Sequence, residues 1–341
     1  MPSSRFRIRQ HKAPLRDAGI AVREYVPAID KYSTIRGLPG EGGPWARPIY
    51  GAWEGAKLVA RAPGVVGSWR GDVTWLEREL LPGRPSLERV LGRPLVWDVD
   101  DAIWLVARDD GGWLRKIARR ADVMVVVNDH VAEWFSGHAR DIRVVPTAVD
   151  TDRWRPVAEA TTARARFVVG WTGISTNFRF LQQIEEPLQR FVAGVEDAEL
   201  LVVADRPPTL RGIPPEKVRF IPWSPRVEAE AVARMDVGIM PLADDEWSRG
   251  KGSFKMLQYM SCGLPVIASP VGMNASVLAH DEVGFPAAGL DDWTDALTAL
   301  HADRELGRQM GRRGRAVVER SFSLAVIAPR LAGIFKEVAA A

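Results

Sequence analysis

The sequence predicts an α/β protein of two domains, each built on a parallel sheet wound with helices. Three observations support this prediction. The chain has 341 residues, whereas an average domain has roughly 150. From about residue 166 onward, short apolar runs alternate with helical patterns, which is typical of a parallel sheet with helices on both faces. A polar, proline-containing stretch at 152–165 without clean periodicity separates this half from the first.

Apolar runs give the expected strands. Those of the second domain are 166–171, 199–205, 217–223, 237–241, 265–269 and 283–287, and those of the first are 93–102, 121–129 and 142–150. One buried helical stripe is predicted by residues at spacings of three and four, namely Leu181, Ile184, Leu188 and Phe191. Residues 111–122 and 226–235 predict further helices, and the Gly/Pro-rich segment 36–48 predicts a long loop.

The composition indicates a soluble globular protein and excludes several other classes. Apolar residues make up 46% of the chain and charged residues 26%, as in ordinary soluble globular proteins. The net charge is only +3, so the basic pI is no argument for a nucleic-acid partner, and we expect none. Cys262 is the only cysteine, which excludes an internal disulfide and fits a cytoplasmic setting. No apolar run reaches the roughly 18 residues of a membrane-spanning helix, and the start has no signal-peptide pattern.

The first 60 residues are basic, with ten basic against five acidic side chains. Arg5, Arg7, Arg9 and Lys12 are expected to form a basic N-terminal face. Such a face is by default solvated. It could equally meet an anionic membrane surface, as a peripheral contact.

Residues 250–272, "GKGSFKMLQYMSCGLPVIASPVG", are the segment from which a binding site is first predicted. Ser253 is a candidate N-cap, 254–262 a short helix, and Gly263 its C-terminal stop. The apolar run that follows predicts a central strand, so the start of the helix lies at one edge of the sheet. Backbone amides at a helix start attract anions.

Two glycines and two lysines surround that helix start. Gly250 and Gly252 allow the backbone to approach a ligand, and Lys251 and Lys255 add positive charge. Phosphate is the ligand that this combination favours. The alternative is that both lysines are solvated surface side chains.

A second glycine-containing turn follows the strand at 166–171. Gly170 and Gly173 lie in "VVGWTGISTNFRFL", between a strand and a helix start, where phosphates are often held. The segment lacks the GxGxxG fingerprint and by itself is a weak signal. Because ligands gather outside the carboxyl ends of neighbouring strands, the two turns together favour a nucleotide diphosphate.

Three carboxylates follow a predicted strand in the first domain. Asp98, Asp100 and Asp101 in "WDVDDAIW" could position hydroxyl groups, act as a base or hold a metal, and one of them could instead cap a helix that begins at Asp101. A metal site is the weakest reading, because no histidine or further carboxylate run accompanies them.

Residues 250–274 resemble the donor-site segment of the family 4 glycosyltransferases, which are retaining enzymes with the GT-B fold. The resemblance covers nearly the whole chain, in the expected order. It includes 3–20, 72–82, 97–104, 144–154, 170–181, 218–223, 235–242 and 306–323.

The resemblance implies two facing Rossmann-like domains with a cleft between them. The acceptor domain would span 1–152, the nucleotide-sugar domain 153–320, and a last helix at 321–341 would return toward the first domain. No metal or other cofactor is normally required.

The resemblance also implies residue roles. Lys251 and Lys255 match the cationic catalytic positions that stabilise the leaving diphosphate. The donor-binding positions are Gly170, Gly173, Gly250, Gly252, Ser253 and Gln258. The acceptor-side candidates are Arg78, Asp98, Asp100 and Asp101.

This sequence departs from the family pattern at three places. Gly250 and Gln258 stand where family members commonly carry two glutamates, which leaves the donor sugar undefined. The usual basic pair in the first donor-domain turn is absent, and Arg179 is the nearest cation. The family's first strand should precede residue 3, so we expect that about 10–20 residues are missing at the start, since a Rossmann-like sheet needs that central strand.

The function predicted is transfer of a sugar from a nucleotide-diphospho-sugar to a glycan, a lipid-linked glycan or a small metabolite, as in polysaccharide assembly. Two alternatives remain. The chain could be a non-catalytic relative that serves as a binding or partner subunit, given Gly250 and Gln258. It could also be a sugar-nucleotide epimerase with the same fold, which needs no acceptor.

Overall fold

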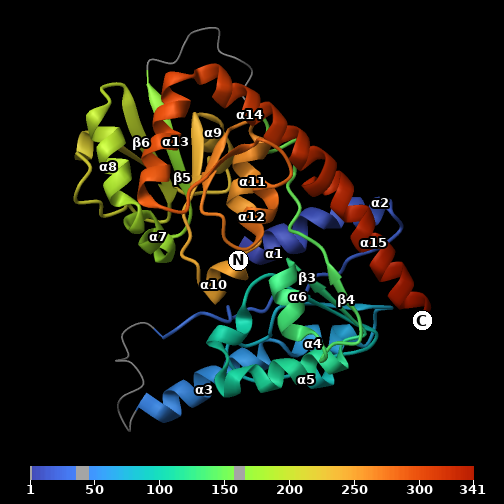
Figure 1. Cartoon of the computed structure of the whole chain (residues 1–341). Coiled ribbons are helices and arrows are strands. Elements are labelled where there is room, and N and C mark those ends of the chain that lie inside the picture. The colour runs from blue at the N-terminus through green and yellow to red at the C-terminus, as the bar shows by residue number, and fades with distance from the viewer. Residues whose placement is uncertain (1, 36–45, 157–165) are drawn as a thin grey trace. The chain divides into compact units, whose positions relative to one another are not determined.

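The computed structural model describes residues 2–35, 46–156 and 166–341. They form two compact units, Met1–Pro146 with Ala328–Ala341, and Thr147–Ile327 (Figure 1). Each unit contains one sheet, and every strand pair in both sheets is parallel. The predicted α/β class with two parallel sheets is confirmed. Most of the stretch expected to connect the domains, 157–165, lies outside the described residues.

The sheet of the first unit has the order β1-β2-β3-β4. Its strands are β1 (Thr74–Glu77), β2 (Leu95–Val99), β3 (Val123–Val126) and β4 (Ile142–Val144). The last three were predicted. The sequence analysis did not identify β1 as a strand, because it has only four residues and ends in a glutamate instead of forming an apolar run.

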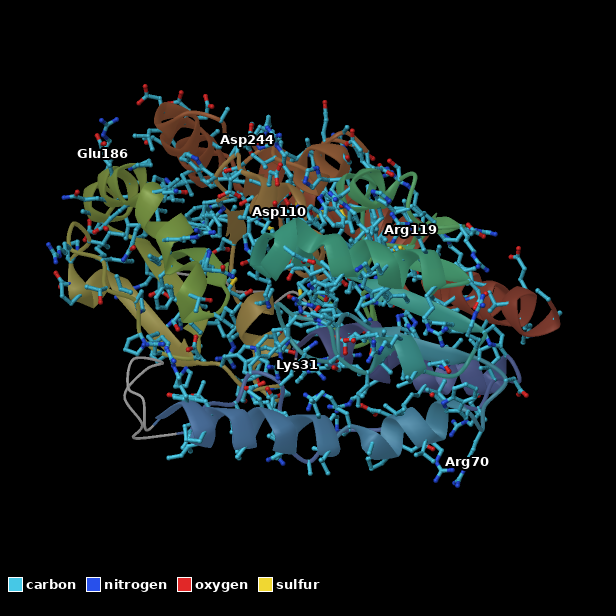
Figure 2. All side chains as sticks on the ribbon, turned by 90° about the horizontal axis from the view of Figure 1, so that it is seen from below. Lys31, Arg70, Asp110, Arg119, Glu186 and Asp244 are labelled. Atoms are coloured by element: carbon cyan, nitrogen blue, oxygen red, sulfur yellow. The ribbon has the colours of Figure 1, made fainter. Side chains whose placement is uncertain are left out.

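Within the described residues, the first unit has six helices and the end of a seventh. They are α1 (Pro2–Arg7), α2 (Lys12–Asp17), α3 (Ala46–Val59), α4 (Ala62–Ser68), α5 (Gly112–Arg120), α6 (Asp129–Phe135) and α15 (Leu324–Ala340). The helix predicted at 111–122 is α5. Of the loop predicted at 36–48, residues 36–45 lie outside the described part, and 46–48 instead begin α3. Helices α3 and α4 lie end to end (Figure 2).

A buried ion pair ties the N-terminal helix to the sheet of the first unit. The Arg7 guanidinium is 2.8 Å from Asp98 Oδ1, and its Nη1 donates to the Val145 carbonyl at 2.8 Å. Asp98 also accepts a hydrogen bond from Trp75 Nε1 at 3.2 Å. Burial raises the pKa of Asp98, and Arg7 opposes that shift.

The basic N-terminal face predicted from the sequence is therefore wrong for one of its four members, Arg7. Arg7 is only 3% exposed, because it neutralises Asp98. Arg9 and Lys12 both pair with Glu24, at 2.8 and 2.9 Å, and Arg5 lies over the Phe6 ring. These side chains are held by their own neighbours within the unit.

The sheet of the second unit has the order β7-β6-β5-β8-β9-β10. Its strands are β5 (Phe167–Thr172), β6 (Ala198–Ala204), β7 (Val218–Pro222), β8 (Val237–Met240), β9 (Val266–Ala268) and β10 (Gly284–Pro286). All six were predicted. Counted within the unit, the order is 3-2-1-4-5-6, the arrangement of dinucleotide-binding sheets. Strand order reverses between β5 and β8.

Helices cover both faces of this sheet (Figure 1). They are α7 (Phe178–Gln183), α8 (Glu185–Gly194), α9 (Glu228–Ala233), α10 (Glu246–Arg249), α11 (Phe254–Ser261), α12 (Met273–Leu278), α13 (Leu290–Ala302), α14 (Arg304–Val317) and the start of α15. Val168 belongs to the core that contains α11, and Val169 to the core that contains α8 and α13. The strands are thus buried on both faces. The predicted stripe from Leu181 to Phe191 is fully buried but is split between α7 and α8.

We expect Arg7→Met to lower the free energy of unfolding by about 3–5 kcal/mol, because it leaves the buried Asp98 carboxylate without a counter-charge. Urea unfolding followed by circular dichroism measures the change. Arg9→Met is the matched control: its ion pair with Glu24 is at the surface, where the expected cost is below about 1 kcal/mol. Equal losses in the two variants would contradict the structural role assigned to Arg7.

Candidate functional site

The sheet of the second unit brings two loops together at its carboxyl edge. Strands β5 and β8 are parallel neighbours, so the turn at 173–177 and the segment 241–253 start side by side. The Tyr259 hydroxyl of α11 accepts a hydrogen bond of 2.8 Å from the Thr172 backbone N–H at the end of β5. Burial raises the pKa of Tyr259 to about 12, so the hydroxyl stays neutral. Helix α11 is thereby fixed at the point where strand order reverses, the usual ligand position in such sheets.

The start of α11 differs from the prediction in one respect. Ser253 directly precedes the helix, but its side chain does not cap it. Its backbone is left-handed, with φ of 48°, and its Oγ donates to Asn274 Oδ1 at 2.7 Å. Asn274 in turn donates to the Ser269 carbonyl at 3.1 Å. The predicted stop at Gly263 is confirmed, with φ of 73°.

Because Ser253 Oγ donates to Asn274, the Ser253 side chain does not accept a hydrogen bond from the backbone N–H groups that begin α11. The N-terminus of a helix carries roughly half a positive charge and favours an anion. The cap predicted at Ser253 would have partly satisfied this end. Its absence leaves the helix terminus suited to an external anion.

Both lysines of the predicted site lie at this helix terminus. Lys251 is in the segment between α10 and α11, partly buried, with its ammonium 5.0 Å from the centroid of the Trp247 ring. Lys255 is in the first turn of α11 and is also partly buried. Gly250, buried at the end of α10, and Gly252 flank Lys251. Their positive charges and the positive end of the helix together favour an anion at this place.

Gln258, one turn further along α11, is fully buried at 0% exposure. Neither its amide oxygen nor its amide nitrogen has a hydrogen-bond partner among the described residues. Ser248 Oγ in α10 is in the same situation, on a residue that is 1% exposed. A buried polar group without a partner costs about 1–3 kcal/mol, so such groups usually serve a ligand, an ordered water or catalysis.

The first donor-domain turn is only partly as predicted. Gly170 does not lie in the turn: it is a buried residue of β5, and a side chain there would collide with Met235. Its missing side chain therefore serves packing. Gly173 does follow the strand, with its N–H bonded to the Val203 carbonyl. Arg179 is exposed and lies over the Phe180 ring at 4.5 Å.

The sequence analysis did not identify Asp205 as the residue that holds this turn. It follows β6 and accepts hydrogen bonds from the Ser175 N–H at 2.6 Å and from Ser175 Oγ at 2.8 Å. Ser175 also accepts from Arg206 Nε at 2.8 Å. The only signal in the sequence was the position of an aspartate directly after an apolar strand.

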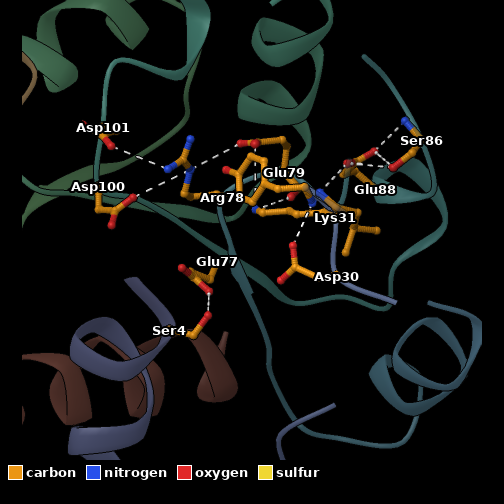
Figure 3. A network of polar contacts seen from close by, with 12 residues as sticks. Ser4, Asp30, Lys31, Glu77, Arg78, Glu79, Ser86, Glu88, Asp100 and Asp101 are labelled. Carbon is orange, nitrogen blue, oxygen red and sulfur yellow. Dashed lines mark hydrogen bonds and ion pairs between the residues drawn. The ribbon is translucent and has the colours of Figure 1, made fainter. Parts of the chain in front are cut away.

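In the first unit, a polar cluster lies at the carboxyl ends of β1 and β2 (Figure 3). Arg78 follows β1 and faces three carboxylates: Glu79 at 3.6 Å, Asp100 at 3.8 Å and Asp101 at 3.5 Å. Its backbone is left-handed, with φ of 55°. Non-glycine residues held in this region are strained and concentrate at functional sites.

Several atoms of this cluster lack hydrogen bonds. Arg78 Nε, Asp100 Oδ1 and both carboxylate oxygens of Glu79 have no hydrogen-bond partner among the described residues. Glu79 is only 2% exposed. Burial acts to lower the pKa of Arg78, but Glu79 and Asp100 outweigh it and raise the pKa. Arg78 and these carboxylates are too far apart for direct hydrogen bonds, so hydroxyl groups or waters could bind between them.

The acceptor-side candidates therefore separate into two groups. Arg78, Asp100 and Asp101 are brought together. Asp98 is 0% exposed and engaged by Arg7, outside this cluster. The alternative that one of these carboxylates caps a helix is not borne out, because the next helical turn (Ile103–Val106) has no side-chain cap and Asp101 pairs with Arg78.

The sequence analysis missed Glu79 and Lys31 as members of the cluster. Lys31 Nζ donates to the Glu79 carbonyl at 2.9 Å and lies 3.8 Å from its carboxylate. Lys31 is 48 positions away in the chain, so no local pattern joins the two. The available signal was a pair of carboxylates, Glu77 and Glu79, on either side of Arg78 where β1 ends.

Comparison with protein families finds one match, over residues 168–303, to the family described as glycosyl transferases group 1. The match runs from β5 to the end of α13. The second unit is therefore a glycosyltransferase group 1 domain.

Two named relatives are similar to part of the chain. A GDP-mannose-dependent monoacylated alpha-(1-6)-phosphatidylinositol monomannoside mannosyltransferase of Corynebacterium glutamicum is 26% identical over 254 residues, 65% of this chain and 64% of that protein. An N-acetyl-alpha-D-glucosaminyl L-malate synthase of Bacillus anthracis is 30% identical over 175 residues, 48% of this chain and 44% of that protein. The chain thus spans less than two thirds of the length of each.

Solved structures extend the likeness in fold to both units. Sucrose-phosphate synthase from Thermosynechococcus elongatus has a TM-score of 0.67 at 16% identity, covering 98% of this chain and 93% of that one. The Anabaena protein HepE in complex with UDP and glucose has a TM-score of 0.63 at 14% identity, covering 82% of this chain and 81% of that one. The architecture is that of the GT-B glycosyltransferases.

We expect Gln258→Met to leave the free energy of unfolding unchanged or to raise it by up to about 2 kcal/mol, because it removes two buried polar atoms that lack partners. Urea unfolding without nucleotide is the measurement. Gln183→Met, at an exposed position of α7, controls for the change of residue type. A loss of more than about 1 kcal/mol would mean that the amide is already satisfied within the protein.

Proposed function

We propose that this chain, whose residues 168–303 form a group 1 glycosyltransferase domain, transfers a sugar from a nucleotide-diphospho-sugar to a hydroxyl group, with retention at the anomeric carbon. The observation that carries the proposal is the position of Lys251 and Lys255. Both lie at the start of α11, beside the point where strand order reverses. Retention rests on the resemblance to family 4 glycosyltransferases.

The proposed role of the two lysines follows from the charge of the leaving group. Transfer breaks the bond between the anomeric carbon and a diphosphate oxygen, so negative charge develops on that oxygen. Lys251, Lys255 and the positive end of α11 would stabilise this charge, and such preorganised electrostatics is usually the largest contribution to catalysis. Because the protein supplies these cations itself, the proposal includes no metal and no other cofactor.

Gln258 is proposed to bind the nucleotide portion of the donor. Its amide lacks partners, and an amide oxygen can accept a hydrogen bond from a ribose hydroxyl without the charge assistance of a carboxylate. Gly250 and Gly252 give a ligand access to the backbone beside Lys251. Since Gly250 provides no carboxylate to bind the sugar, the proposal does not specify which sugar is transferred.

The acceptor is proposed to be rich in hydroxyl groups and to bind at the Arg78 cluster. The carboxylates of Glu79 and Asp100 accept hydrogen bonds from hydroxyls, and they disfavour a phosphate group at the same place. The relatives are named for a phosphatidylinositol monomannoside and for L-malate as the molecules they act on or make products from. A glycan, a lipid-linked glycan or a small polyhydroxylated metabolite all fit, as in polysaccharide biosynthesis.

The proposed setting is the cytoplasm, because nucleotide sugars are co-substrates there. Cys262, the single cysteine, is buried, and burial raises the pKa of its thiol to about 12, so it is unreactive. None of the helices in the described part of the chain has the length and apolar character needed to cross a membrane.

Gly250 and Gln258 replace the two glutamates common in family 4 glycosyltransferases, and these replacements favour one competing function, a non-catalytic binding subunit. An epimerase with the same fold is the other alternative. Incubation of the enzyme with its nucleotide sugar, with and without an acceptor mixture, distinguishes them. Transfer needs the acceptor, epimerisation consumes or converts the donor without it, and a binding subunit leaves the donor unchanged.

We expect one of UDP, GDP, dTDP or ADP to raise the thermal midpoint of the wild type, since a ligand that binds the native state stabilises it. Lys255→Ala should weaken that nucleotide about 10–100-fold, the effect of losing a hydrogen bond to a charged group. Lys336→Ala, an exposed lysine of α15, should bind as the wild type does. If no nucleotide stabilises the protein, or if both variants behave alike, the donor site is elsewhere.

We expect Asp100→Asn to lower kcat/KM for the acceptor by roughly 10–100-fold, because a charge-assisted hydrogen bond to a hydroxyl becomes a neutral one. The thermal shift given by the nucleotide should stay unchanged. Asp72→Asn, at an exposed position before β1, provides the control. Unaltered acceptor kinetics for Asp100→Asn would place the acceptor outside the Arg78 cluster.

A further inference from the structure

The outer face of α3 and α4, meaning the exposed residues between 47 and 70, is apolar. Val59 is 73% exposed, Trp69 68%, Val66 53% and Ile49 46%. Every other exposed residue in this range is alanine, glycine, proline or arginine. Large apolar side chains exposed this densely on one element mark an interaction site rather than ordinary surface.

The exposed side chains follow helical periodicity. On α4 and its end, Ala62, Val66 and Trp69 recur at spacings of four and three. On α3, Pro48, Ala52 and Val59 recur at spacings of four and seven. These spacings put each set on one side of its helix. Each helix therefore has its exposed apolar side chains on one side.

The charge on this outer face has one sign. Arg47 and Arg70 are its exposed charged residues (Arg70 is labelled in Figure 2, at the end of the two helices). Glu54 is the only carboxylate from 46 to 70, and it is partly buried and paired with Lys57 and Arg84. The nearest exposed carboxylate that follows in the chain is Asp72.

A second loop enlarges the surface at Trp69. The indole N–H of Trp69 donates to the Val90 carbonyl at 3.0 Å. Val90 is 41% exposed, and the neighbouring Arg89 is exposed as well. Trp69 and Val90 thus lie together at this end, and each has an exposed arginine beside it in the chain, Arg70 and Arg89.

We propose that the outer face of α3 and α4 docks on an anionic lipid surface. Helices with an apolar side and arginines, and with tryptophan at the edge, lie in the plane of the lipid headgroups. The 23 residues from Ala46 to Ser68 are helical except for two, which gives a rod of roughly 35 Å at 1.5 Å per residue. A fluid lipid surface accommodates such a rod along its length, and anionic headgroups pair with Arg47, Arg70 and Arg89.

This surface replaces the membrane contact expected from the sequence. That expectation relied on Arg5, Arg7, Arg9 and Lys12, which the structure shows to be buried or engaged by neighbouring side chains. The present proposal rests on α3, α4 and the loop at 89–90 alone. It does not depend on the proposed reaction.

Co-sedimentation of the full chain with extruded vesicles tests the proposal. We expect binding to vesicles of equal parts phosphatidylglycerol and phosphatidylcholine, and at least tenfold weaker binding to phosphatidylcholine alone. Raising the salt from 0.1 M to 0.5 M should release the protein, because exposed charges are screened. Absence of binding to the anionic vesicles at 0.1 M salt overturns the proposal.

Variants assign the binding to this face. Arg70→Gln should lower the partition coefficient about fivefold, and Arg70→Gln with Arg89→Gln about 25-fold, from roughly 1 kcal/mol for each arginine near the surface. Val66→Ser with Trp69→Ser should lower it at least tenfold. Arg226→Gln and Leu290→Ser, at exposed positions of the second unit, are the matched controls and should bind as the wild type does.

Two further readouts keep the result interpretable. Circular dichroism and the nucleotide thermal shift should be unchanged in every variant, which shows that the protein is folded. Equal losses in the control variants overturn the assignment to this face. Size-exclusion chromatography that shows a dimer, lost in Val66→Ser with Trp69→Ser, overturns it as well, because a second copy of the chain would then cover the face.

Discussion

Parallel strand pairing is the constraint on which the rest of this protein depends. In a parallel sheet all carboxyl ends lie at one edge, and each strand must be followed by a crossover before its neighbour begins. The segments that leave that edge are therefore gathered side by side, although they are far apart in sequence. In the second unit this gathers Gly173, Ser175 and Asp205 with the segment from 241 to the start of α11. In the first unit it gathers Arg78 with Asp100 and Asp101.

Both edges hold polar groups that the protein itself does not satisfy. Gln258 and Glu79 are almost entirely buried, yet neither side chain is given a hydrogen bond by the described residues. Such arrangements cost stability in the free protein. Binding of a diphosphate at one edge and of hydroxyl groups at the other would give these polar groups partners and recover the lost stability.

Other buried charged residues have a purely structural role. Asp98 belongs to the same sequence motif as Asp100 and Asp101, but its two oxygens are bound by Arg7 and Trp75. The pair anchors the N-terminal helix to the sheet. The same motif thus serves both the stability of the first unit and the polar cluster beside it, and only the direction of each side chain separates the two roles.

The sequence by itself determined the α/β class, nine of the ten strands, the stop at Gly263 and the clustering of Lys251 and Lys255 at a helix start. These depend on apolar periodicity and on local backbone preferences, which a few neighbouring residues set. Only the tertiary structure decided that Gly170 makes room for Met235, that Ser253 turns to Asn274, and that Lys31 joins Glu79 beside Arg78. Each of these is a contact between residues that are remote in the chain, and its energy depends on which groups burial leaves within reach. Pattern reading cannot supply that information, because it is fixed by how the crossovers pack on the sheet.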